Sequence, residues 1–172
     1  NEQSVAHLPG IVKVVVQGDF VGIVAEREEQ AIAAMRQLEV KWKDWAGVPD
    51  LSLNAMHDTL VKHEMTDRML REDAGIDEAF SGAKKVIEAD YVWPYHLHAS
   101  IGPSCAVAEV SASQIQVWTG SQNPHDVRKD IATLTGMAAD QINVTRLEAS
   151  GCYGRNCADD VASDAVLLSQ AV

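Results

Sequence analysis

A glycine-containing loop, residues 150–156 with the sequence SGCYGRN, separates an alternating apolar run from a helix-like run. The run before it, residues 142–147, has the period of a strand, and residues 159–172 after it have the period of a helix. A glycine loop between a strand and a helix start can turn backbone N–H groups toward an anion. The same residues also fit a plain strand-to-helix turn, so this loop alone does not distinguish a binding site from a connection.

Composition limits the classes of protein that remain. The chain has 172 residues and a formal net charge of −11 without any cluster of Lys and Arg, which argues against nucleic-acid binding. The three cysteines, Cys105, Cys152 and Cys157, lack the spacing of a disulfide framework, and a Cys152–Cys157 bridge is disfavoured. No stretch is apolar enough to span a membrane, and no signal peptide is visible. We therefore expect a globular domain with neither a nucleic-acid partner nor a membrane span.

Both ends of the chain read as interior parts of a longer protein. Residues 2–8 resemble a short helix at the very start, and an apolar helical stripe is still running at the last residue. A domain rarely stops with such a stripe unfinished, so we expect a fragment. The stripe consists of Val161, Ala165, Leu168 and Val172.

The apolar pattern predicts an α+β fold in three parts. Residues 1–45 read as a leading helix followed by β-β-α-β, residues 46–75 as a linker or extended arm, and residues 76–172 as a second α+β unit. In the first part we expect strands at 11–16, 20–25 and 39–43 and a helix at 27–38, with Ala31, Ile32, Met35 and Leu38 on one face. In the last part we expect strands at 85–93, 104–110, 114–119 and 142–147 and helices at 124–135 and 159–172.

A second strand-to-helix junction, residues 119–125 with the sequence TGSQNPH, contains a further candidate. Helix capping accounts for Ser121 or Asn123 as N-cap and for Pro124 at the first helical position. Capping does not account for Gln122, whose amide can donate and accept hydrogen bonds at once. Gln122 is therefore the functional candidate of this junction.

Other reactive side chains give weaker indications. His96, His98 and Cys105 suggest a metal site, but no further ligand has convincing spacing, so hydrogen-bonded histidines are favoured. Arg155, beside the loop glycines, fits either a phosphate contact or a surface ion pair. A thiol nucleophile at Cys152, just before a helix, is a further hypothesis.

Four of these stretches, in this order, resemble the large subunits of molybdenum hydroxylases, the xanthine dehydrogenase and aldehyde oxidase family. The Gly-Arg ending of the loop is most similar to the isoquinoline 1-oxidoreductase β-subunit type. The resemblance covers most of the chain outside residues 46–75. Residues 18–26, 30–34 and 40–42 resemble the family's α/β hammerhead segment, 88–99 the opening of its molybdopterin-binding domain, 117–124 its glutamine segment near the metal's oxo ligand, and 150–155 its Gly-Gly-Gly-Phe-Gly loop.

The resemblance implies a partial α/β hammerhead module in residues 1–45 and the first part of the molybdopterin-binding domain in residues 76–172. It implies a molybdenum–molybdopterin cofactor in the cytosine dinucleotide form. It also implies hydroxylation of an aldehyde or N-heterocycle with water as the oxygen source, and an iron–sulfur subunit or domain as electron-transfer partner. Members of the family occur in the bacterial cytoplasm and periplasm.

Carried over residue by residue, the resemblance assigns cofactor contacts but no direct metal ligand. Gln122 would hydrogen-bond the molybdenum oxo group, and backbone N–H groups around Tyr153 would face the metal's oxygen ligands. The cofactor-binding residues that the resemblance implies are Gln122, Gly151, Cys152, Tyr153, Gly154 and Arg155.

The sequence also departs from the family pattern. Cys152 replaces a glycine, Tyr153 replaces a phenylalanine, and Gly102 with Pro103 stands where this type commonly has Glu-Pro. The family's catalytic glutamate is expected beyond Val172, so no catalytic residue is assigned within the chain. We therefore expect the chain alone to be inactive and to retain no cofactor. The alternative is a non-enzymatic α+β domain that binds a partner through its sheet.

Overall fold

A computed structural model of the chain describes residues 1–44, 52, 55–62, 64–91, 93–94, 96, 98–153 and 161–172. The chain divides into two units: the first unit comprises Asn1–Trp42 and Leu97–Val172, and the second unit comprises Lys43–His96. Strands and helices are both present, so the expected α+β class is confirmed.

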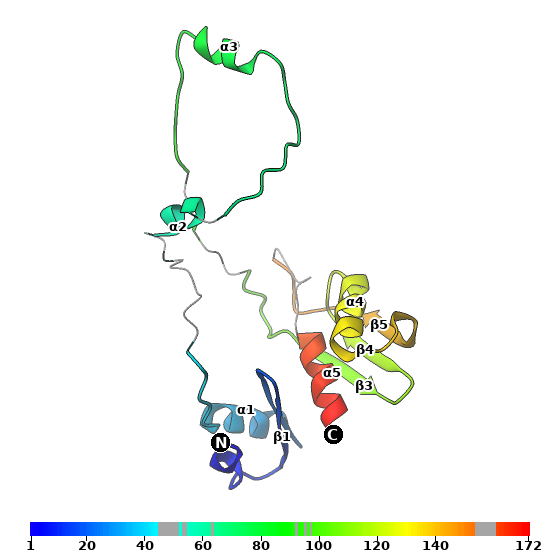
Figure 1. The fold of residues 1–172 in the computed structure, drawn as a ribbon. Coiled ribbons are helices and arrows are strands. Elements are labelled where there is room, and N and C mark those ends of the chain that lie inside the picture. The colour runs from blue at the N-terminus through cyan, green and yellow to red at the C-terminus, as the bar shows by residue number, and fades with distance from the viewer. Residues whose placement is uncertain are drawn as a thin grey trace. The chain divides into compact units, whose positions relative to one another are not determined.

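The first unit begins with a β-hairpin flanked by helical segments (Figure 1). A short 3-10 helix, η1 (Glu2–Val5), precedes the antiparallel strands β1 (Ile11–Gln17) and β2 (Phe20–Ala25), and the helix α1 (Glu28–Gln37) follows them. Gly18, with φ +63°, opens the two-residue hairpin turn, where glycine adopts positive φ without steric cost. Val5 and Ala34 are fully buried where η1 and α1 meet.

The predicted apolar face of α1 lies against a groove. The groove has a volume of about 350 Å³, and Met35 in its wall is still 64% exposed. Residues 39–43, predicted to be a strand, run beside it without strand pairing. The groove is lined by Val21, Gly22, Ile23, Ala31, Ile32, Met35, Leu38, Val40 and Trp42.

A three-stranded sheet forms the other half of the first unit. Its order is β3 (Ala106–Val110), β4 (Ile115–Thr119), β5 (Ile142–Arg146), with β3 antiparallel and β5 parallel to β4. The helix α4 (Pro124–Thr135) and the short 3-10 helix η2 (Ala139–Gln141) connect the two parallel strands. Because β4 and β5 run in the same direction, the loops that leave them begin at the same edge of the sheet.

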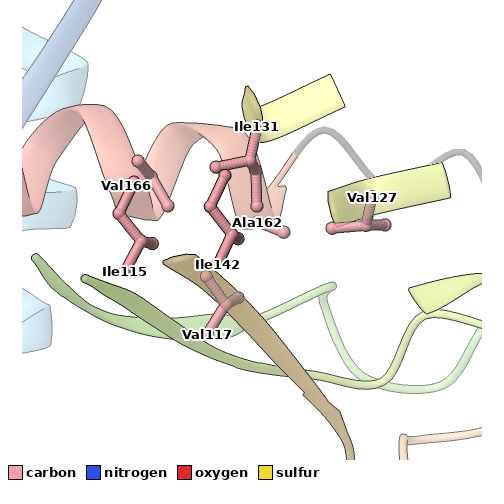
Figure 2. Packing of buried hydrophobic residues seen from close by; sticks show 7 residues of the cluster. All are labelled: Ile115, Val117, Val127, Ile131, Ile142, Ala162 and Val166. Atoms are coloured by element: carbon pink, nitrogen blue, oxygen red, sulfur yellow. The ribbon is translucent and has the colours of Figure 1, made fainter. Parts of the chain in front are cut away.

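The core of this half lies between the sheet and two helices. Strand alternation directs Ile115, Val117 and Thr119 to the face that α4 and α5 (Val161–Ala171) cover. Figure 2 shows the apolar side chains of the strands pointing toward those of the helices. The buried cluster consists of Ile115, Val117, Val127, Ile131, Ile142, Ala162 and Val166.

The helix α5 contacts the hairpin as well as the sheet. A Cβ atom placed on Gly22 of β2 would lie 2.6 Å from Leu168 Cδ2, and Lys13 Nζ donates a hydrogen bond to the Ala171 carbonyl at 2.5 Å. The buried residues of α5 are Ala162, Val166 and Leu167, which differ from the apolar stripe expected from the sequence. The difference arises because the helix packs against both the sheet and the hairpin.

The second unit contains two short helices, α2 (Met56–Lys62) and α3 (Ile76–Ser81), neither of which has a buried residue. The strand expected at residues 85–93 is not formed in the described part of this stretch, where Ile87 is 78% and Tyr91 89% exposed. A strand requires a ladder to a neighbour, and no described residue pairs with this segment. Among the described residues, no helix has the length and apolar character needed to cross a bilayer.

Candidate functional site at the edge of the parallel strands

Three chain segments meet at one edge of the three-stranded sheet. The β4 loop (residues 120–123) and the β5 loop (residues 147–153) leave the parallel strands there, and the entry segment (residues 98–105) leads into the antiparallel β3. The Leu147 N–H donates to the Thr119 carbonyl at 2.9 Å, which extends the pairing past the strand ends. The sheet therefore fixes where the two loops begin and where the entry segment ends.

The two loops are joined by a contact between two sequence-predicted candidates. Gln122 Nε2 lies 2.7 Å from Cys152 Sγ and donates a hydrogen bond to it, although the two residues are 30 positions apart. Gln122 is exposed and Cys152 is half-buried. The structure thus brings together the candidate of each strand-to-helix junction.

Local hydrogen bonds occupy the other residues of the β4 loop, although Asn123, at the N-cap position, makes no side-chain capping bond. Ser121 is fully buried and its Oγ accepts a hydrogen bond from the Asn123 N–H at 3.2 Å. Asn123 precedes the first residue of α4 and its side-chain amide donates to Asp126. A hydrogen bond from Lys129 and the charge of its ammonium group lower the pKa of Asp126. These contacts hold the start of α4, and the Gln122 side chain reaches the other loop instead.

The backbone of the β5 loop has positive φ at two residues, one of which is a glycine. Gly151 has φ +114°, in a region that side chains rarely enter, and Tyr153 has φ +37°. A Cβ atom on Gly151 would lie 2.6 Å from Tyr153 Cε2, so the aromatic ring closely covers this glycine. Tyr153 itself is 63% exposed. The loop is therefore shaped by one glycine and one aromatic ring.

The entry segment holds the β5 loop through two hydrogen bonds that sequence reasoning missed. Ser100 Oγ donates to the Gly151 carbonyl at 3.2 Å, and Ser150 Oγ donates to the Gly102 carbonyl at 3.1 Å. A Cβ atom on Gly102 would lie 3.0 Å from Ser150 Cβ, so the departure at Gly102 makes room for this approach. Serines in irregular segments follow no helical or strand period, so the sequence pattern did not mark them. The small size of Gly102 and Ser150 was the one sign that these two segments could approach closely.

A small cleft of mixed polarity lies between the entry segment and the two loops. Its volume is about 110 Å³, well below the roughly 300–1,000 Å³ of a typical cofactor pocket. The cleft alone is therefore too small to enclose such a cofactor. It is lined by Ser100, Pro103, Ser104, Cys105, Gly120, Glu148, Ala149 and Ser150.

A buried hydroxyl at the end of β4 has no hydrogen-bond partner among the described residues. Thr119 is 2% exposed and its Oγ1 lies one residue before the β4 loop. Burying a hydroxyl without a partner costs free energy, and this one lies on the helix-covered face of the sheet.

The remaining candidates divide between described and undescribed parts of the chain. Gly154, Arg155 and Cys157 lie outside the described residues. Cys105 is exposed, and Cys105 and Cys152 are both free thiols. No three His, Cys, Asp or Glu side chains in the described ranges are grouped closely enough to hold a metal ion.

Comparisons with known proteins identify the family. The sequence model of the molybdopterin cofactor-binding domain matches residues 56–171. The chain is 52% identical over 173 residues to a nicotinate dehydrogenase subunit of Pseudomonas putida, which covers 100% of this chain and 14% of that protein. The chain thus spans about a seventh of this relative's length.

Solved structures agree with the sequence comparison on the fold. The Cu,Mo-CO dehydrogenase superposes with a TM-score of 0.71 at 18% identity, covering 100% of this chain and 28% of that chain. Quinoline 2-oxidoreductase from Pseudomonas putida 86 gives a TM-score of 0.65 at 17% identity, with 99% and 27% covered. The resemblance expected from the sequence is confirmed. The chain belongs to the molybdopterin cofactor-binding domain family of the molybdenum hydroxylases.

Proposed function

We propose that this chain forms one wall of a molybdenum–molybdopterin site in a larger oxidoreductase that hydroxylates an N-heterocycle of the nicotinate type. The observation that carries the proposal is the contact of Gln122 with Cys152, which joins the two candidate loops at one sheet edge. Membership of the cofactor-binding family supports the cofactor class.

The residues present fit a ligand rich in oxygen atoms. The Gln122 amide supplies an N–H donor and a carbonyl, and the β5 loop passes through Gly151, where a ligand can approach the backbone closely. Gly154 and Arg155 join this set by resemblance alone.

Each residue has a binding or orienting role in this proposal. Gln122 would donate a hydrogen bond to an oxygen of the cofactor, and the backbone of residues 151–153 would line its oxygen ligands. When bound, the cofactor supplies the redox chemistry, with water as the oxygen source. The general base would be a glutamate beyond Val172, so the isolated chain is expected to be inactive and to retain no cofactor.

The substrate class follows from the relative with 52% identity, whose name gives nicotinate as its substrate. On this basis we favour an N-heterocycle over an aldehyde. The cytosine dinucleotide form of the cofactor and an iron–sulfur partner belong to the same proposal. The division into residues 1–45, 46–75 and 76–172 also remains a prediction.

The test uses the full-length protein that contains this chain, purified together with its electron-transfer partner. Metal analysis should find about one molybdenum per polypeptide, and acid hydrolysis should release CMP from the cofactor. Incubation with nicotinate in H₂¹⁸O should place ¹⁸O in the product. A protein that folds and assembles but contains no molybdenum would instead support the non-enzymatic partner-binding domain.

A further inference from the structure

The contact between Gln122 and Cys152 joins two side chains whose backbones are held independently. On one side, the buried Ser121 hydroxyl accepts the Asn123 N–H at 3.2 Å. On the other, Ser100 Oγ donates to the Gly151 carbonyl at 3.2 Å. With both backbones held, the remaining freedom at the contact lies in the side-chain torsions of Gln122 and Cys152.

A glutamine amide has a donor end and an acceptor end, and rotation about its last torsion exchanges them. Gln122 Nε2 points at Cys152 Sγ at 2.7 Å, and a thiol sulfur is an acceptor for such an N–H. The amide nitrogen carries two hydrogens, so the sulfur accepts one N–H and thereby sets the direction of the other, which is the donor proposed to reach an oxygen of the cofactor. A glycine, which the resembled family has at this position, offers no atom that could do this.

We propose that Cys152 is a positioning residue that fixes the orientation of the Gln122 amide toward the cofactor. The proposal rests on the proposed function, because it gives Gln122 a cofactor contact. It also assigns the thiol a role other than nucleophile, since its partner in the structure is an amide and not a base.

The test compares Cys152→Ala, Cys152→Gly and Cys152→Ser in the full-length protein assembled with its electron-transfer partner. The alanine and glycine variants should keep the wild-type molybdenum content but lower kcat for nicotinate about tenfold, with KM changed less than about twofold, because a misdirected group costs rate and not affinity. They should also alter the EPR signal of the reduced molybdenum. Serine, whose hydroxyl accepts the same N–H, should restore kcat to within about threefold of wild type.

Two further measurements isolate the contact itself. Ser113→Ala changes an exposed residue of the β3–β4 turn, at the opposite end of these strands from the two loops, and should leave the molybdenum content, kcat and the EPR signal unchanged. Gln122→Ala should make Cys152 react several-fold faster with iodoacetamide, as read by peptide mapping, because the covering amide is gone.

The outcomes separate this proposal from the proposed function. Wild-type protein without molybdenum refutes the proposed function and this inference with it. Alanine and glycine variants that match a molybdenum-loaded wild type in kcat and EPR signal overturn the positioning role alone. Loss of molybdenum from these variants also overturns it, since Cys152 would then act in cofactor retention. An unchanged alkylation rate in Gln122→Ala would show that the amide does not hold the sulfur.

Discussion

A methyl group added at Gly151 should weaken the proposed cofactor site through the shape of the β5 loop. The backbone there has φ +114°, and holding alanine in such a region costs about 1–3 kcal/mol. The added Cβ would also lie 2.6 Å from Tyr153 Cε2, so the ring must move. If about 2 kcal/mol of this strain disfavours the binding-competent loop, the apparent cofactor affinity falls about 30-fold.

The assay is the molybdenum content of the full-length Gly151→Ala protein, measured after purification and again after prolonged dialysis. Gly136→Ala is the matched control, because Gly136 has φ +73° at the end of α4 and no atom within 4 Å of an added Cβ. This control should lose some stability and no cofactor. Adding Tyr153→Ala to Gly151→Ala should recover part of the loss, because the ring contact is removed while the backbone strain remains. If Gly151→Ala retains molybdenum as well as Gly136→Ala does, the reasoning is wrong.

Three other predictions concern the fold of the first unit. Ile131→Ala should lower the free energy of unfolding by about 2–5 kcal/mol in a denaturant titration, because Ile131 is fully buried in the core cluster. Asp126→Asn should flatten the loss of stability in acid: the lowered pKa of Asp126 gives stability above its ordinary value of 3.8 that disappears as the pH falls through the lower folded-state pKa. Lys13→Met should lower the melting temperature by only a few degrees, because its exposed hydrogen bond to the Ala171 carbonyl contributes about 1 kcal/mol.

Local signals account for what the sequence predicted well. The helix α4 runs from Pro124 to Thr135 as expected, because its start and stop are encoded by neighbouring residues. Pro124 sits in the first turn, and Gly136 ends the helix in the left-handed conformation with φ +73°. The strands on either side of α4 follow from alternation in the same way.

Contacts between distant segments were only partly predictable. The sequence identified Gln122 and Cys152 separately, but their contact depends on the parallel register that pairs Thr119 with Arg146. Ser100 gave no signal in any periodic pattern, since its role is one hydrogen bond across 51 positions. The buried face of α5 was misassigned because the helix contacts the sheet and the hairpin at once.

The segments that failed as strands share one physical property. Trp42 is 61% exposed and Trp93 79% exposed, and both lie in runs with strand-like composition but no pairing among the described residues. A strand gains its stability from a neighbour, whereas α4 carries most of its hydrogen bonds within itself.

In the three-stranded sheet, by contrast, every strand has a neighbour with which it pairs. β3 and β4 pair through a short turn, and α4 returns the chain so that β5 pairs parallel to β4. In the described part of the chain, the candidate site is formed by the edge of this sheet and the entry segment beside it. Its geometry is therefore set by contacts that the chain itself provides, which is why substitutions at Gly151 and Cys152 can be interpreted locally.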